Sequence, residues 1–348
     1  MAEQSVFESA IILLRKETNA GSEGEPPALF PLSWLSDLGT DQARTLAKIW
    51  SQLPVVYRRD LISRMEEEAR KNFELDFTAI ARISLADDDP EVRGHAVRAL
   101  WECDDLKLAD RFLQLLEKDA DPLVRACAAD ALGSFMDRAE LEEIPADVSA
   151  RVERGLIGAF RGTDDLDVRR KALESISFLS NAQVSDMIQT AYRHPDERMR
   201  VSALKAMGRT FDSQWSDQVV QEMKSVSHAM RAEASRAAGE LVLRKTVPLL
   251  VQLLEDADSS VRRNAIWSLG EIGGTAARHA LEKLQNRTDE DDEESDLVEE
   301  ALDNAEFQES LGDPRLLEQE ADDSEFDDEE IDDEEDSSDE DDPLKDEE

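Results

Sequence analysis

The stretch DPEVRGHAVRAL, residues 89–100, returns along the chain at a nearly constant spacing. Later copies are DPLVRACAADAL at 121–132, DLDVRRKALESI at 165–176, DERMRVSALKAM at 196–207, SHAMRAEASRAA at 227–238, DSSVRRNAIWSL at 258–269 and a degenerate ESDLVEEALDNA at 294–305. The fourth residue of each copy is an apolar anchor, and successive anchors are separated by 32, 44, 31, 31, 31 and 36 residues. A period near 31 residues is one helical hairpin, so the sequence predicts a stack of hairpins.

Each copy has the pattern of a helix that packs closely against its neighbours. Four positions after the anchor, on the same helix face, there is always an alanine. These alanines are Ala96, Ala128, Ala172, Ala203, Ala234, Ala265 and Ala301. Three positions before the anchor stands Asp in five copies and Ser in a sixth, and both residue types cap helix N-termini. Each copy therefore predicts the start of a helix with an apolar stripe.

A second periodic segment lies between successive copies and supplies the partner helix of each hairpin. Examples are LADRFLQLLEK at 108–118 and VPLLVQLLED at 247–256. Residues 40–72 predict one further pair, divided at Pro54. The predicted fold is thus all-α, an α-solenoid of about eight helical hairpins. The spacing of 44 predicts an inserted surface loop at residues 137–147.

Composition changes at both ends of the repeat region. Residues 5–18 predict an amphipathic helix that covers the first pair, because terminal repeats need a covering element. Residues 20–31, rich in Gly, Pro and Glu, have the composition of a linker. We therefore predict an N-terminal helix and linker at 1–32, a solenoid at 33–309, and an acidic disordered tail at 310–348.

The phrase D-P-x-V-R-x-x-A-x-x-A-L resembles the HEAT repeats of the phycobilisome-lyase type, over residues 74–307. Residues 46–101, with NFELDF at 72–77 and LWECDD at 100–105, also resemble a group of uncharacterised bacterial HEAT-repeat proteins. The resemblance implies an α-solenoid and no particular activity. It also implies that the arginine after each anchor bonds an aspartate in a neighbouring turn. The structural ladder that this implies consists of Arg93, Arg125, Arg169, Arg200, Arg231 and Arg262.

Acidic residues dominate the charge of the chain, most of all at its C-terminal end. The formal net charge is −42, and residues 289–348 alone hold 34 acidic and 2 basic residues. The preceding residues are left with a net charge of −10. Such a field repels nucleic acid phosphates and anionic membranes, and it favours basic protein surfaces or simple solubility.

The cysteine content and the apolar runs bear on the location of the protein. Cys103 and Cys127 are the only cysteines, and both fall in helical patterns, which argues against a disulfide framework or a cysteine metal site. No stretch approaches the ~20 apolar residues that a spanning helix needs. We therefore expect a protein of the reducing cytoplasm.

Three enzyme classes built on similar repeats can be compared with these residues. Deoxyhypusine hydroxylases hold two irons with paired His-Glu steps, whereas each histidine here is followed by Ala or Pro. The spacings His194 to Glu197 and His279 to Glu282 resemble half a metal site, but they lie far apart in the stack. Phycobilisome lyases need a bilin groove, which the sequence leaves open, and DNA glycosylases need a basic one. We expect no catalytic residue, no cofactor and no metal site.

A binding groove can be located from helical geometry. At 100° per residue, the buried positions leave an open side near 240° from the anchor, so residues two, six and nine after it should face outward. The candidate groove row is Arg170, Lys205, Arg236, Arg263 and Trp267, with Trp101 at the early end. Trp and Arg are frequent anchors of interfaces. The alternative is an ordinary surface, balanced by Asp130, Glu174 and Glu233.

These features together predict a monomeric, non-catalytic protein-binding scaffold that uses the groove, assisted by the acidic tail. The expected partner is a protein or peptide, for which a basic surface is one option, and neither nucleic acid nor membrane is expected. Leu316, Leu317, Phe326 and Ile331 interrupt the acid runs of the tail, which suits short-motif binding. The tail is also expected to rest weakly on the groove row. Two alternatives stay open: a chaperone-like shield for basic proteins, and a phycobilisome-lyase-like or other HEAT-repeat enzyme.

Overall fold

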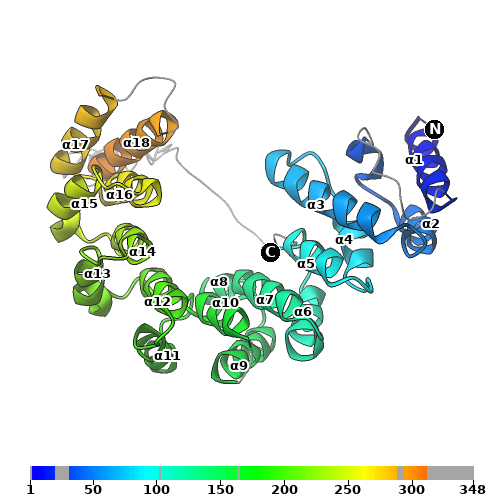
Figure 1. Ribbon diagram of the computed structural model, residues 1–348, viewed down its shortest axis with the longest axis horizontal. Helices are drawn as coiled ribbons and strands as arrows, with labels where there is room; N and C mark the ends of the chain where they lie inside the picture. The colour runs from blue at the N-terminus through cyan, green and yellow to red at the C-terminus, as the bar shows by residue number, and fades with distance from the viewer. Residues whose placement is uncertain (1, 20–30, 102, 163–164, 288–293, 312–348) are drawn as a thin grey trace, which may run out of the picture.

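The computed structural model describes residues 2–19, 31–101, 103–162, 165–287 and 294–311. Over these residues every regular element is an α-helix or a short 3-10 helix, and the helices stack side by side into an open arc (Figure 1). One helix of each hairpin lines the concave side of the arc, and its partner lies on the convex side. The prediction of an all-α solenoid is confirmed.

Eight helix pairs make up the described part of the arc. The inner helices are α3 (Val55–Lys71), α5 (Pro90–Arg98), α7 (Pro122–Ala131), α10 (Leu166–Ile176), α12 (Glu197–Arg209), α14 (His228–Glu240), α16 (Ser259–Ile272) and α18 (Ser295–Leu311). The outer helices are α2 (Thr40–Trp50), α4 (Thr78–Ser84), α6 (Lys107–Lys118), α9 (Ala146–Arg161), α11 (Ala182–Tyr192), α13 (Ser216–Glu222), α15 (Val247–Leu253) and α17 (Thr275–Gln285). The repeated phrase therefore always forms the inner helix.

The starts of the six inner helices α5, α7, α10, α12, α14 and α16 follow from their capping residues. The side chains of Asp89, Asp121, Asp165, Asp196, Ser227 and Asp258 all accept a hydrogen bond from a backbone N–H of the first turn. These bonds satisfy amides that have no partner inside the helix. Pro90 and Pro122 occupy the first helical position, where the missing N–H costs nothing.

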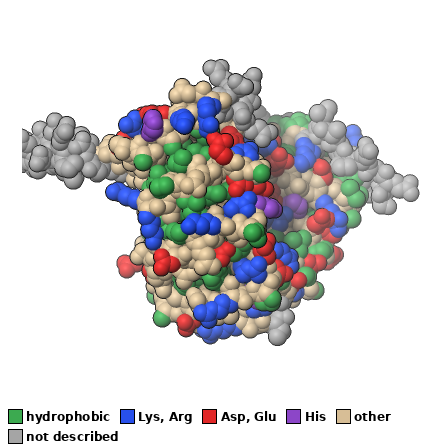
Figure 2. Space-filling model, turned by 60° about the vertical axis from the view of Figure 1, so that its left-hand side comes forward, with side chains coloured by type: hydrophobic (Ala, Val, Ile, Leu, Met, Phe, Trp, Pro, Cys, Tyr) green, Lys and Arg blue, Asp and Glu red, His purple; other side chains and the backbone are tan. Residues whose placement is uncertain are grey.

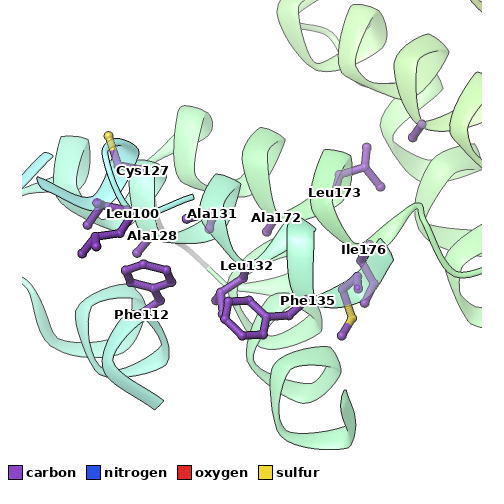
Figure 3. Packing of buried hydrophobic residues seen from close by; sticks show 14 of the residues in the cluster. Leu100, Phe112, Cys127, Ala128, Ala131, Leu132, Phe135, Ala172, Leu173 and Ile176 are labelled. Atoms are coloured by element: carbon purple, nitrogen blue, oxygen red, sulfur yellow. The ribbon is translucent and has the colours of Figure 1, made fainter. Parts of the chain in front are cut away.

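The core is one continuous hydrophobic cluster that runs from Phe7 to Ala305. The first six anchors and all seven alanines of the repeats are buried. Figure 3 shows how the small side chains on α7 leave room for the outer layer, with Phe112 of α6 beneath Ala128. Phe112 and Phe135 meet edge to face, with ring centroids 6.4 Å apart.

The anchor of the last repeat is one residue later than the sequence pattern suggests. Leu297 is only partly buried, whereas Val298 is fully buried and continues with Ala301 and Ala305 along one helix face. Because both residues are apolar, the phrase alone could not choose between them. Packing against the preceding repeat makes the choice.

Late inner helices approach each other closely at the ninth residue after the anchor. This residue is Gly208, Gly239 or Gly270 in successive repeats. A Cβ added to Gly270 would lie 2.9 Å from the Cα and carbonyl oxygen of Ala301 on the next inner helix. The expectation that the ninth position faces outward is therefore wrong for these repeats: it lies at a helix contact that only glycine permits.

The insertion predicted as a loop at residues 137–147 is mostly helical. A short helix, α8 (Gly133–Glu140), follows α7, and α9 begins at Ala146, so only residues 141–145 form the turn. Phe135 and Met136 of α8 are buried in the core. Within the predicted loop only Ile144 is buried, whereas Leu141, Glu142 and Glu143 are exposed, so the surface loop is confined to the short turn between α8 and α9.

The N-terminal helix α1 (Ala2–Asn19) packs against α2 and the 3-10 helix η1 (Leu32–Leu35). Phe7, Ala10, Ile11 and Leu14 bury its apolar face in the common core, as expected of a covering element. Most of the predicted linker and nearly all of the predicted tail lie outside the described residues. The proposed domain boundaries at residues 32 and 309 stay predictions.

Candidate functional site

Polar side chains connect neighbouring inner helices along the concave side. They stand mainly at positions three, six and ten after the anchor, opposite the buried stripe. At one junction Asn304 donates to Glu271, and at another Lys171 pairs with Asp130 at 3.1 Å. On the flank of the late repeats that Figure 2 brings forward, acidic and basic side chains are also interspersed. The concave side is therefore a polar seam rather than a uniformly basic groove.

Glu174 is the centre of this seam, at the junction of α10 and α12. Its side chain is only 4% exposed, and it lies 3.0 Å from Lys205 Nζ and 3.1 Å from Lys171 Nζ. Ser202 Oγ donates to it over 2.5 Å. Burial would raise the pKa of Glu174, but the charges of Lys205 and Lys171 and these hydrogen bonds outweigh it and lower the pKa to about 2.

The pKa values of Glu233 and Glu240 on α14 are shifted in the opposite direction from that of Glu174. One carboxylate oxygen of each is shut off from solvent and has no hydrogen-bond partner among the described residues. Burial raises the pKa of both carboxyl groups, although Arg236 and Lys205 act against it. The later part of the seam thus holds two carboxylates that are poorly solvated when charged.

We expect Glu233→Gln to stabilise the protein at pH 7, by about 1 kcal/mol, because it removes a buried charge whose oxygen lacks a partner. Since burial raises the folded-state pKa, the native state binds a proton more readily than the unfolded state. The gain should therefore shrink as the pH falls toward the ordinary pKa of glutamate. Thermal unfolding at several pH values measures this, with exposed Glu117→Gln as the control. A gain that is constant with pH would contradict the electrostatic explanation.

Most of the candidate groove row is engaged within the fold. Arg170 donates to Ser202 Oγ over 2.9 Å and pairs with Asp167 at 2.8 Å, while Lys205 is held by Glu174. Arg236 pairs with Glu240 at 3.1 Å, and its guanidinium lies 5.8 Å from the ring centroid of Trp267. Of the remaining members, Arg263 is exposed, and Trp101 lies in the turn after α5. The structure does not bring the row together as one open basic surface.

The arginines after the anchors tie each inner helix to the turn that precedes it. Nη1 of Arg93, Arg125, Arg200, Arg231 and Arg262 donates to backbone carbonyls five and six residues earlier. Arg93 and Arg231 also form bidentate ion pairs with an aspartate before the next inner helix. Their acceptors are Asp119 and Asp256. Arg169 instead donates to the carbonyl of Phe160 and lies over its ring.

Arg58 makes the same kind of contact one repeat earlier, and the sequence analysis missed it. It donates to the carbonyl of Leu53 over 2.6 Å and to Asp87 over 3.0 Å. Trp50 donates to the same carboxylate over 2.8 Å. The sequence did carry a signal for this contact, because Arg58 directly follows the buried Tyr57, as an arginine follows the anchors of the next six repeats. The match was incomplete because Leu61 stands four residues after Tyr57, where the later repeats have alanine.

Exposed aromatic rings gather at the early end of the concave side. Trp101 is 49% exposed and Phe73 86% exposed. Trp101 lines two shallow depressions of ≈ 250 and ≈ 220 Å³, both of which are also lined by Arg70 and Arg98. Arg98 is held by Glu66, His95 and Cys127, whereas Arg70 is more than half exposed and donates to Glu66 over 2.8 Å. Arg70 therefore keeps N–H donors directed to solvent beside two aromatic rings.

The histidines considered for metal binding have other surroundings. His194 Nδ1 accepts the backbone N–H of Asp196 in the turn before α12, and exposed His279 lies 3.8 Å from Glu282. Among the described residues, no three or more His, Cys, Asp or Glu side chains are grouped so that they could hold a metal ion. Within the same residues, no helix is both long and apolar enough to cross a membrane.

Comparison with protein families identifies the repeats. The family model described as HEAT repeats matches residues 79–146 and 216–303. These two stretches contain α5 to α8 and α13 to α17, together with the phrase that defines the period. No curated protein matches the chain.

Several solved structures resemble the fold at low sequence identity. The complex of CpcE and CpcF of phycocyanin lyase from Nostoc sp. PCC7120 is 20% identical, covering 66% of this chain and 94% of that chain, with a TM-score of 0.45. Importin beta is 12% identical, covering 78% and 43%, with a TM-score of 0.44. Human deoxyhypusine hydroxylase is 16% identical, covering 77% and 96%, with a TM-score of 0.33.

Proposed function

We propose that the chain is a protein-binding scaffold whose early concave end holds a peptide segment of the partner, and the match of residues 79–146 and 216–303 to HEAT repeats supports this. A stack of repeats presents a long curved surface in which each unit contacts only its neighbours, a design suited to binding extended ligands. The middle of the concave side is internally neutralised around Glu174. The proposal therefore moves the main contact from the groove row to the Trp101 end.

The observation that carries this proposal is the exposure of Trp101 and Phe73 beside Arg70. Large aromatic rings left in water are costly on a monomer surface and are typical centres of interfaces. The rings offer an apolar surface, and the guanidinium offers paired donors to a carboxylate. The site thus fits a segment with an apolar side chain next to an acidic one. The acidic tail would contact basic groups elsewhere on the same partner.

We expect Trp101→Ala to weaken capture of the native partner by about 2 kcal/mol or more, roughly 30-fold in Kd. The test is affinity purification of the tagged protein from its native host, followed by titration of the captured protein. Leu141→Ala removes a 63% exposed apolar side chain from the turn after α8 and serves as the control. Unchanged affinity of Trp101→Ala would reject the proposed site.

Removal of residues 310–348 separates the scaffold from the alternative of an acidic shield. A scaffold that binds through the Trp101 end keeps most of its affinity without these residues. Loss of all binding on removal, together with normal binding by Trp101→Ala, would instead support a chaperone-like shield for basic proteins.

A further inference from the structure

One turn position takes a left-handed backbone in three successive late repeats. It follows the inner helix, twelve residues after the anchor, and is occupied by Phe211 (φ 51°), Val242 (φ 49°) and Gly273 (φ 60°). After α14 the turn closes as Leu243 N–H donates to Ala238 and Val242 N–H donates to Gly239. Glycine usually fills this position because a side chain is strained there, above all a β-branched one.

Phe211 and Val242 are also largely exposed, by 75% and 50%. Gly273 shows that the turn itself needs no side chain. Two apolar residues are therefore held in a strained conformation and in contact with water, on neighbouring repeats along one edge of the arc. Backbone strain and apolar exposure at the same positions indicate a binding surface. We call Phe211 and Val242 the edge pair.

The chain leaves the described structure beside this edge. Helix α18 ends at Leu311, and its Gln308 lies so close to Gly273 that an added Cβ there would meet Gln308 Cβ at 2.7 Å. Arg244, Gly273, Gly274 and Gln308 line a shallow groove of ≈ 680 Å³, which connects the last turns of α18 with Arg244, two residues after Val242. Whatever follows Leu311 therefore starts one repeat away from Val242.

The residues that follow have the composition and the reach to cover the edge pair. The sequence continues as GDPRLLEQE, residues 312–320, with adjacent Leu316 and Leu317 followed by acidic residues. Five or six extended residues span at most about 17 to 20 Å. Neighbouring helices are about 8 to 10 Å apart, so the two leucines reach the repeats of Val242 and Phe211.

Charge supports the same placement. Arg244 and Lys245 are exposed beside Val242, and Arg244 lines the groove, while Lys245 makes only a long, exposed pair with Asp217 at 3.6 Å. Within residues 312–325, six acidic residues outnumber one arginine. The groove row offers less positive charge to an acidic segment, because Arg170 and Lys205 already pair with Asp167 and Glu174. Exposed charges attract weakly at physiological salt, so apolar contact must supply most of the affinity.

We propose that residues 312–320 dock along this edge of the solenoid, with Leu316 and Leu317 covering Val242 and Phe211. This contact fixes the start of the acidic segment at the late end of the arc, away from the Trp101 end. It also shields an apolar surface that would otherwise promote association between molecules. The inference is independent of the proposed binding of a partner at Trp101.

The first test compares the full-length protein with the full-length variant Leu316→Ser/Leu317→Ser by hydrogen exchange. Backbone amides of residues 209–213 and 240–244 should exchange several-fold faster in the variant, because the cover is lost. Leu344→Ser changes another leucine of the same acidic segment and should leave these rates unchanged. Equal rates in all three proteins would overturn the proposal.

The reciprocal test changes the edge pair. Asparagine tolerates the left-handed backbone, so Phe211→Asn/Val242→Asn keeps the turns and removes the apolar surface. NMR signals of Leu316 and Leu317 should become as sharp as that of Leu344 in this variant. If the amides of residues 209–213 and 240–244 stay protected at 0.5 M salt, apolar docking is supported. If that protection is lost at high salt and is lost equally in Leu344→Ser, the role of Leu316 and Leu317 is rejected. Protection that grows with protein concentration would assign the edge to a second copy and also overturn the proposal.

Discussion

Glu174→Gln is expected to destabilise the protein by about 3 to 5 kcal/mol at pH 7. The variant replaces a carboxylate that is 4% exposed and leaves the ammonium groups of Lys171 and Lys205, which are 33% and 21% exposed, beside a neutral amide. Burying charges without their counter-ion costs far more than an exposed pair contributes. Chemical denaturation measures the change. Glu67→Gln breaks an exposed pair with Lys71 on α3 and should leave stability essentially unchanged.

The same substitution should change the acid sensitivity of the fold. Because the pKa of Glu174 is about 2 in the folded protein and near 4.5 otherwise, the unfolded state binds its proton first as the pH falls. The stability that Glu174 provides is complete above pH 4.5 and disappears as the pH falls from 4.5 to about 2. Glu174→Gln should lose this part of the pH profile. A variant with wild-type stability and acid response would show that the seam at α10 and α12 contributes nothing to the fold.

Gly270→Ala is expected to destabilise the protein by roughly 1 to 3 kcal/mol, although alanine is the better helix former. The added Cβ would lie 2.9 Å from the Cα and carbonyl oxygen of Ala301, so α16 and α18 must move apart. A flexible side chain could rotate away, but a backbone cannot. Thermal unfolding of the two proteins gives the difference.

Gly158→Ala provides the matched control for this substitution. Gly158 lies on the outer helix α9, and a Cβ there meets nothing within 4 Å. The same change should therefore stabilise the protein, by about 0.5 to 1 kcal/mol, through helix propensity alone. If both substitutions were stabilising, the late inner helices would not be in backbone contact at their glycines, and the packing described for α16 and α18 would be wrong.

The period, the inner helices and the residues that begin and fill them could all be predicted from the sequence alone. Aspartates such as Asp89 cap amides two or three residues away, and Ala203 lies on the same face as its anchor Met199. These relations are local and recur about every 31 residues, so the same pattern can be recognised several times in one chain. The fold class could be predicted for this reason.

Where the pattern was interrupted, tertiary packing decided. The residues directly after α7 form helix α8, whose Phe135 and Met136 are buried in the core. Val298 rather than Leu297 was buried because α18 rotates to fit α16, and Gly239 met Trp267 and Ser268 of the next repeat instead of solvent. Neighbouring helices select among sequence choices that are locally equivalent.

The candidate site depended still more on tertiary structure. Helical angles placed Lys205 and Arg236 on the open side of the inner helices, but their partners Glu174 and Glu240 are fixed by contacts between and within repeats. Trp101 and Phe73 are joined into one surface by helices α3 and α5, from two different hairpins. A charged or aromatic side chain could contact several different neighbours with similar free energy, and the sequence does not show which. Only the spacing and rotation of adjacent helices determine which neighbour it meets and which surface stays open to a partner.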